Sequence, residues 1–208
     1  MGEEVRSEEV GAVTARKRPK PGERRIQILQ ALAAMLEQPQ NDRITTAALA
    51  AQLDVSEAAL YRHFASKAQM FEGLIEFIEQ SVFTLANQII EREPAPEQQV
   101  ARLLGMVLQF AQKNPGMCRV MAGDALLLEH ERLGARMNQF WDRLESVLRQ
   151  AYKALADARQ VPTPTVDAQA AASLAVAVLL GRMQRFNRSG FKRMPTEHLD
   201  AAVQQLLR

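Results

Sequence analysis

The sequence predicts an all-α fold in which an N-terminal three-helix unit containing a helix-turn-helix precedes a larger C-terminal helical domain. Apolar residues recur three and four positions apart along most of the 208 residues, the period of an amphipathic helix. Ala and Leu are abundant, aromatic residues make up only 5%, and there are no valine-rich alternating runs typical of strands. Two short helical segments split by a tight turn lie between residues 45 and 64, which predicts the helix-turn-helix.

Residues 1–22 form a charged and polar tail that contains Pro19 and Pro21 and is expected to be disordered. Its second half runs into the basic stretch "ARKRPKPGERR". That stretch is compatible with a solvated tail and with an arm that touches phosphate or reaches a minor groove. The domains that follow are predicted over residues 23–66, which bind DNA, and 67–208, which form dimers and bind a partner.

The first helix is predicted over residues 23–37. Its apolar side chains recur on one face, at Ile26, Leu29, Leu32, Ala33 and Leu36. The polar stretch "QPQND" ends the helix.

Two short helices are predicted next, near residues 45–53 and 56–64. Thr45 and Ser56 are suitable N-caps for them. Asp54 lies at the turn position that needs a left-handed backbone, which Asp tolerates better than most residues. A small core against the first helix is expected from Ile44, Leu49, Ala50, Leu53, Val55, Leu60 and Phe64.

The C-terminal domain is predicted to begin with a long helix over residues 67–91. Ser66 and Gln69 form a capping box at its start. Its apolar stripe is expected at Phe71, Leu74, Ile78, Leu85 and Ile89. Pro96 is well placed to open the next helix, which ends at "KNPG", and further helices are expected over 117–128, 131–156, 166–189 and 196–207.

The outward side chains of the second helix-turn-helix helix suit DNA. Ser56, Glu57, Ala58 and Ala59 begin it, and small side chains allow close approach to base edges. Glu57 is able to accept from a cytosine amino group and Ser56 to bond bases or phosphates. The residues that follow are able to contact phosphate: Tyr61, Arg62 and His63. The alternatives are core packing for Tyr61 and His63, and a solvated position for Arg62.

Lys67 stands in the first turn of a helix, where a positive charge opposes the helix dipole at a cost of about 0.3–1 kcal/mol. A nearby phosphate would reverse that cost, because the helix N-terminus and the ammonium would both face it. A tolerated surface lysine is the alternative.

Charge and composition exclude several classes. Residues 15–70 hold nine Lys and Arg against five Asp and Glu, so the excess positive charge lies around the helix-turn-helix. Cys118 is the single cysteine, and the longest apolar run, residues 170–181, is shorter than the roughly 20 residues of a membrane span. We expect a cytoplasmic protein without a membrane segment. His63, His130 and His198 lack metal-ligand spacing and no glycine-rich phosphate loop exists, so neither a metal, a cofactor nor an enzymatic activity is expected.

The stretch "TTAALAAQLDVSEAALYRHFASKAQMFEGLIEF" resembles the N-terminal domain of the TetR family of bacterial regulators, and its "LYRHF.SK" ending is specific for that family. The resemblance implies a three-helix DNA-binding domain followed by a helical dimerisation domain. It places Thr45 on a phosphate, with Thr46 beside it on the same surface. The Ala-rich segment 166–189, which ends in Arg182, Arg185 and Arg188, fits the four-helix interface through which such proteins form homodimers. A buried core helix of a monomer is the alternative.

From about Arg24 to Leu207, stretches such as "LIEFIE", "RMNQFWDRLE" and "FKRMPT" are similar to the nucleoid-occlusion members of this family. Those members bind chromosomal sites as dimers and antagonise assembly of the tubulin-like division protein FtsZ by binding its C-terminal tail. The resemblance implies a nucleoid-associated protein. The matching tail-binding residues are Phe77, Met106, Lys113 and Asn114, while Leu85 and Gln109 replace an expected arginine and glycine. Core or dimer packing is the alternative for Phe77.

The competing function is a TetR-type repressor that a small ligand releases from its operator. A pocket for such a ligand would be lined by Met106, Met117, Met121, Met137 and Phe140. A Met-rich stripe is more often plain core, so a small-molecule ligand is not expected.

Overall fold

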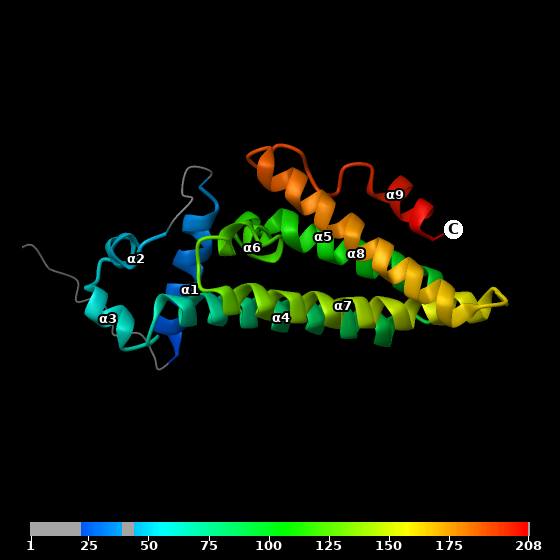
Figure 1. Cartoon of the computed structure of the whole chain (residues 1–208), viewed down its shortest axis with the longest axis horizontal. Helices are drawn as coiled ribbons and strands as arrows, with labels where there is room; N and C mark the ends of the chain where they lie inside the picture. The colour runs from blue at the N-terminus through cyan, green and yellow to red at the C-terminus, as the bar shows by residue number, and fades with distance from the viewer. Residues whose placement is uncertain (1–21, 39–43, 208) are drawn as a thin grey trace, which may run out of the picture.

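The structure, a computed structural model, describes residues 22–38 and 44–207, and this part of the chain folds into helices joined by short connections (Figure 1). The predicted all-α class is confirmed. The elements are α1 Glu23–Leu36, α2 Thr46–Gln52, α3 Glu57–Tyr61, α4 Lys67–Arg92, α5 Pro96–Lys113, α6 Pro115–Met121, the 3-10 helix η1 Asp124–Leu126, α7 Glu131–Ala158, α8 Pro164–Arg188 and α9 Leu199–Leu206. The predicted N-terminal tail lies outside the described residues, apart from Gly22.

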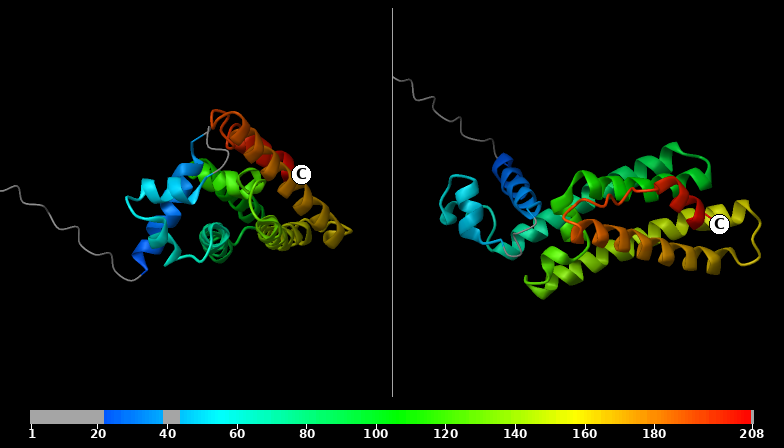
Figure 2. Two further views of the ribbon diagram at one scale, coloured as in Figure 1. Left: turned by 60° about the vertical axis from the view of Figure 1, so that its left-hand side comes forward. Right: turned by 90° about the horizontal axis from the view of Figure 1, so that it is seen from above.

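The helix-turn-helix forms one end of an elongated molecule, and the long helices α4, α7 and α8 extend away from it (Figures 1 and 2). α7 and α8 make the most extensive contact of any two helices in the described part of the chain, and α5 lies against α4, α7 and α8. α1 contacts α2, α4 and α6, so it connects the helix-turn-helix to the C-terminal helices.

Side-chain caps explain why several helices begin where they do. The side chains of Thr45, Ser56 and Ser66 each accept a hydrogen bond from a backbone N–H in the first turn of α2, α3 and α4. Proline is the first residue of α5, α6 and α8. A backbone N–H at this position would have no acceptor within the helix, so proline, which has no N–H, loses no hydrogen bond there. The predicted caps and the predicted role of Pro96 are confirmed.

Two residues predicted for buried stripes lie on the surface. Ile26 is 53% exposed in the first turn of α1, where the true stripe begins two residues later with Ile28 and continues through Leu32 and Leu36. Leu85 is 39% exposed on α4, where Val82 and Ala86 are buried in its place.

The prediction of a single helix over residues 117–128 is wrong. α6 starts earlier, at Pro115, and ends at Met121. Gly123 follows with φ +85, a left-handed backbone that an α-helix cannot continue. After η1 the chain leaves Leu127 80% and Leu128 65% exposed.

α1 and α6 meet without room for a side chain between them. A Cβ added at Gly116 would lie 2.0 Å from the carbonyl oxygen of Ala33. Arg119, one turn further along α6, donates to the carbonyl oxygen of Leu36 at the end of α1 (3.2 Å). α6 therefore holds the end of the molecule that contains the helix-turn-helix against the C-terminal helices.

By length and composition alone, α8 is the helix of the described ranges that could cross a bilayer, and 28% of its apolar window is buried inside the chain. Core helices of soluble proteins pass the same test, so this property is weak evidence for a membrane segment. The expectation of no membrane segment therefore stays a prediction.

Candidate nucleic-acid interface and partner surface

The turn between α2 and α3 has the geometry that the sequence predicts. Asp54 adopts φ +53, and the N–H of Val55 donates to the carbonyl oxygen of Ala50 (3.0 Å). Leu49, Ala50 and Leu60 are buried beneath it. The small core therefore fixes α3 across α2 and leaves its opposite face outward.

The two N-cap hydroxyls of this unit face solvent. Thr45 Oγ1 accepts from the N–H of Ala48 (3.1 Å), and Ser56 Oγ accepts from the N–H of Ala59 (3.3 Å). Accepting leaves the hydroxyl proton of each cap free to donate. Both side chains are thus able to donate to a phosphate while capping their helices.

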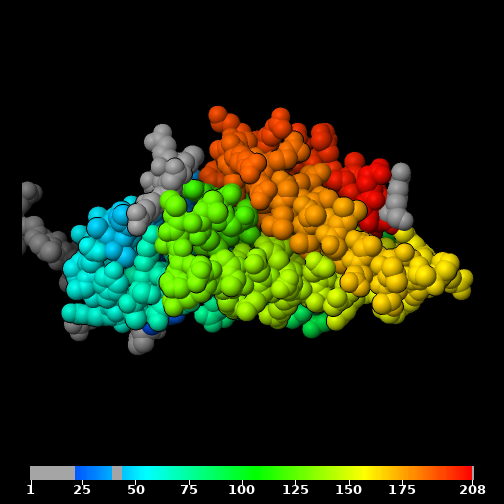
Figure 3. Space-filling model, in the orientation of Figure 1, coloured from blue at the N-terminus to red at the C-terminus, as the bar shows by residue number. Residues whose placement is uncertain are grey.

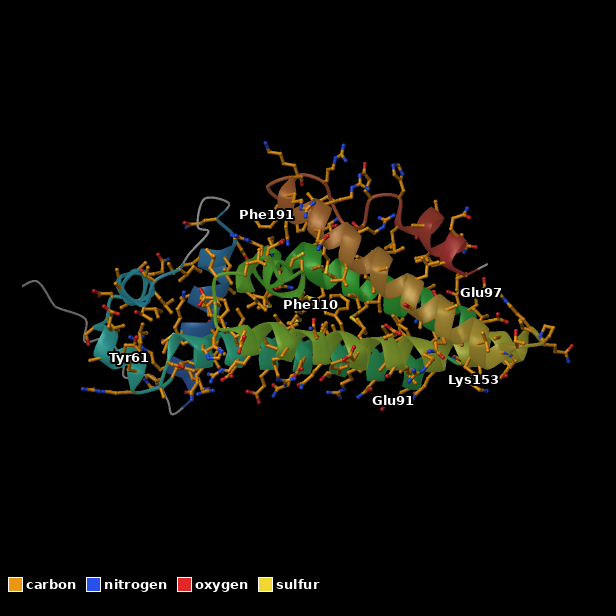
Figure 4. All side chains as sticks on the ribbon, in the orientation of Figure 1. Tyr61, Glu91, Glu97, Phe110, Lys153 and Phe191 are labelled. Carbon is orange, nitrogen blue, oxygen red and sulfur yellow. The ribbon has the colours of Figure 1, made fainter. Side chains whose placement is uncertain are left out.

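The outer surface of α3 is exposed over nearly its whole length. Ser56, Glu57 and Ala58 are exposed, and Ala59 is half-buried. Tyr61 is 46% exposed and lies at the tip of the molecule (Figure 4), and Arg62 and His63 follow it on the surface. Tyr61 and His63 are therefore surface residues and do not fill the small core.

Thr46 and Glu57 contact each other across the two helices. Thr46 Oγ1 donates to Glu57 Oε2 over 2.6 Å, a length typical of a hydroxyl bound to a carboxylate. These are the first residues of α2 and α3. The sequence places both on one surface but offers no signal that they bond.

Lys67 has an intramolecular partner. Its ammonium forms an ion pair with Glu129 in the connection between η1 and α7, and lies 5.7 Å from the centre of the Phe71 ring. The capping box around it also differs slightly from the prediction, because Gln69 Oε1 accepts from the N–H of Ala65 (2.9 Å), one residue before the cap. The Lys67 side chain is thus held at the start of α4 by contacts within the chain.

Arg25 is a residue that sequence reasoning missed at this surface. Its guanidinium donates to the carbonyl oxygen of His63 (3.0 Å) and lies 4.1 Å from the centre of the Phe64 ring. Arg25 therefore braces the chain just after α3. The sequence shows the basic run that contains Arg25. It does not predict the contact with His63, because the two residues are 38 positions apart and no local pattern connects them.

On α4, Phe77 is 43% exposed and lies on the same side as Leu85. α4 and α5 are joined by three residues and run antiparallel, which brings Phe77 level with the end of α5 near Lys113. Lys113 is exposed. Asn114 uses its side-chain amide to donate to the carbonyl oxygen of Phe110 (2.8 Å), so it also ends α5.

Met106 lies apart from these three residues, in a groove of about 410 Å³ between α4, α5 and α9. The groove is lined by Ile89, Arg102, Met106, Gln109, Leu199 and Asp200, among others. Its lining includes Met106 and Gln109 but not Phe77, Lys113 or Asn114. The structure thus does not bring the four predicted partner residues together in one groove.

The residues considered for a small-ligand pocket are mainly core. Met121, Met137 and Phe140 are buried. Phe140 packs edge-on to Trp141 (5.2 Å between ring centres), whose indole N–H donates to the carbonyl oxygen of Met121 (2.9 Å). Burial, assisted by the nearby Asp124 carboxylate, raises the pKa of Cys118 to about 12.

Two family models match the chain. The model for bacterial regulatory proteins of the tetR family matches residues 28–74, and the SlmA-like model, described as a tetracyclin repressor-like C-terminal domain, matches residues 98–208. The nucleoid occlusion factor SlmA of Idiomarina loihiensis is 50% identical over 181 residues, covering 87% of this chain and 92% of that relative. The protein of the same name from Marinomonas sp. is 49% identical over 178 residues, covering 86% and 90%.

Solved structures share the fold at low identity. The regulator FadR from Bacillus subtilis, solved with stearoyl-CoA, superposes with a TM-score of 0.74 at 12% identity, covering 88% of this chain and 97% of FadR. The TetR-family regulator CifR, solved with double-stranded operator DNA, gives a TM-score of 0.70 at 20% identity, covering 92% and 98%. At these identities the likeness concerns the fold alone.

Proposed function

The chain belongs to the TetR family of bacterial regulators and carries its SlmA-like C-terminal domain, and on this premise we propose how it acts in nucleoid occlusion. It is a DNA-binding protein of the SlmA type and not an enzyme. The observation that carries the function is the identity of 47–50% with several SlmA proteins over most of the chain. We propose that, bound to chromosomal sites as a dimer, it antagonises assembly of the FtsZ ring over the nucleoid.

DNA recognition is assigned to the exposed face of α3, inserted in the major groove. The N-cap hydroxyls of Thr45 and Ser56 are free to donate to phosphates on either side. Lys67, Tyr61, Arg62 and His63 add phosphate contacts, which supply affinity and carry no sequence information. Glu57, Ala58 and Ala59 face the base edges.

Dimerisation is assigned to α7 and α8, which make up much of one face of the molecule (Figure 3). Along α8, Val166 is 67% and Leu174 58% exposed, and Ala170 and Ala177 are exposed beside them. An apolar stripe of small residues on a helix surface suits close packing against a second copy. Two copies related by a two-fold axis present two α3 helices, about 34–36 Å apart, to a palindromic site.

The FtsZ tail is assigned to the α4–α5 surface that contains Phe77, Met106, Lys113 and Asn114. The exposed ring of Phe77 offers an apolar anchor, and the ammonium of Lys113 suits an acidic residue of the peptide. The proposed peptide surface on α4 and α5 does not include the exposed face of α3, so the protein would bind the FtsZ tail in the cytoplasm, at the nucleoid, while it is bound to DNA.

The test uses the purified full-length chain, an FtsZ C-terminal tail peptide and DNA fragments selected from the host chromosome. We expect the chain to bind the peptide and its DNA site at the same time, and to map to discrete chromosomal sites in cells. Release of DNA by a metabolite extract, with no binding of the tail peptide, would instead identify a ligand-responsive repressor.

A further inference from the structure

The bond between Thr46 and Glu57 has a role that DNA contact alone does not explain. We propose that Thr46 is a positioning residue for base readout: it holds the Glu57 carboxylate at the angle at which it accepts from a cytosine amino group in the major groove. This inference rests on the proposed function, because it concerns the same DNA-binding surface.

The first step is the proton count at Thr46. A threonine hydroxyl has one proton, and here that proton lies between Oγ1 and Glu57 Oε2, 2.6 Å apart. Thr46 therefore has no proton left for a phosphate, whereas Thr45 uses its oxygen as an acceptor and keeps its proton. Adjacent threonines thus have separate tasks: Thr45 binds the DNA backbone and Thr46 binds Glu57.

The second step is the charge of Glu57. A carboxylate at the start of a recognition helix approaches a polyanion, so it is repelled unless it finds a donor. Among the described residues Glu57 forms no ion pair, and Thr46 is its side-chain partner. In the major groove, the donor that a carboxylate prefers is the N4 amino group of cytosine. The Thr46 bond occupies Oε2 and leaves Oε1 to accept it.

The third step is conformational freedom. Glu57 is exposed, and the large side chain on its face of α3, that of Tyr61 one turn further on, is itself 46% exposed, so packing does not hold the glutamate in one rotamer. An exposed glutamate samples many rotamers and would turn away from the phosphates. The hydroxyl of Thr46 selects one arrangement before DNA binds, and such preorganisation strengthens the wanted contact without adding a new one.

The experiment measures base preference and not affinity alone. The preferred site of the full-length protein is selected from a random duplex library, and every single base-pair substitution is then assayed by competition. Wild type is compared with Glu57→Ala, Thr46→Val, which removes the hydroxyl at nearly constant shape, and Thr46→Ser, which retains it. Thermal unfolding is followed for each variant.

We expect wild type to prefer C·G at one position of each half-site by about tenfold, within the range of a good base contact. Glu57→Ala and Thr46→Val should both reduce that preference to near onefold, Thr46→Ser should restore it, and preferences elsewhere and the salt slope should not change. The double variant, with both Thr46→Val and Glu57→Ala, should show the same base preference as Glu57→Ala alone.

Wild-type base preference in a folded Thr46→Val variant would overturn the inference. Equal weakening at every position, together with a lower Tm, would also overturn it, because it would mean that the bond only joins α2 to α3. A wild-type protein that selects no site at all would be a failure of the proposed function, and it is recognised before any variant is made.

Discussion

The ammonium of Lys67, the first residue of α4, pairs with the carboxylate of Glu129, 62 residues further along the chain. Glu129 lies in the connection that enters α7, so the pair joins the edge of the DNA-binding surface to the C-terminal helices. The Lys67 and Glu129 side chains are 23% and 10% exposed, so the pair is only partly reached by water. In the proposed DNA complex, phosphate and Glu129 would compete for the Lys67 ammonium.

Replacing Lys67 by Ala should weaken binding to all DNA sequences alike and lower the slope of log affinity against log salt by about 0.9, the value for one lost phosphate contact. Glu129→Gln should strengthen non-specific binding, because the neutral amide competes less for Lys67. Lys153→Ala is the control, since Lys153 pairs with Asp157 on the surface of α7. If the salt slope of Lys67→Ala equals that of wild type, Lys67 does not contact DNA phosphate.

The two roles of Thr45 are separable. Thr45→Asp keeps an N-cap acceptor for Ala48 and should leave the free energy of unfolding nearly unchanged, whereas Thr45→Ala should lose about 1 kcal/mol. Both variants should bind DNA weakly, and Thr45→Asp more so, because its charge repels phosphate. Urea unfolding and DNA titrations measure the two effects. Full DNA affinity in Thr45→Asp would contradict the phosphate contact.

Phe77→Asp should abolish binding of the FtsZ tail peptide and leave DNA affinity unchanged, because Phe77 is 43% exposed on a helix outside the helix-turn-helix. Ile90→Asp is a matched control, since Ile90 is 39% exposed nearer the other end of α4. Peptide titrations followed by fluorescence anisotropy give the result. Equal loss of peptide binding in both variants would indicate a general defect of α4.

Gly116→Ala should destabilise the protein by about 1–3 kcal/mol, as overpacking does, because its Cβ would lie 2.0 Å from the carbonyl oxygen of Ala33. Gly134→Ala is the control: nothing lies within 4 Å of its added Cβ, and Ala favours a helix over Gly by about 1 kcal/mol. Thermal unfolding of the two variants should shift in opposite directions. If Gly116→Ala has the same stability as wild type, α1 and α6 can move apart at little cost in free energy.

Cys118 should not react with thiol reagents at pH 8 in the folded protein, because burial raises its pKa from 9.0 to about 12. Because the pKa is raised in the folded protein, the Cys118 thiol of the unfolded chain loses its proton at a lower pH than that of the folded chain. The corresponding stability is present below pH 9 and is lost as the pH rises toward 12. Reaction with a disulfide reagent, with and without urea, tests the first statement, and urea unfolding at pH 8 and pH 10 tests the second. Rapid labelling of Cys118 in the native protein would contradict the first statement, and equal stability at pH 8 and pH 10 would contradict the second.

The sequence by itself determined most of the helices and the helix-turn-helix, because their signals are local. The caps Thr45, Ser56 and Ser66 each bond to a residue three positions on. The left-handed turn at Asp54 depends on the intrinsic preference of one residue. The outward position of the α3 surface followed from the apolar residues on its other side.

Only the tertiary structure decided which parts of each face are covered and which polar groups meet. Periodicity placed Ile26 and Leu85 on apolar stripes, but within residues 22–38 and 44–207 the packing of the helices leaves both side chains exposed. The partners of Arg25, Thr46 and Lys67 lie 38, 11 and 62 residues away along the chain. Helical spacing states which residues share a face, whereas contacts at such separations depend on how the helices pack in three dimensions.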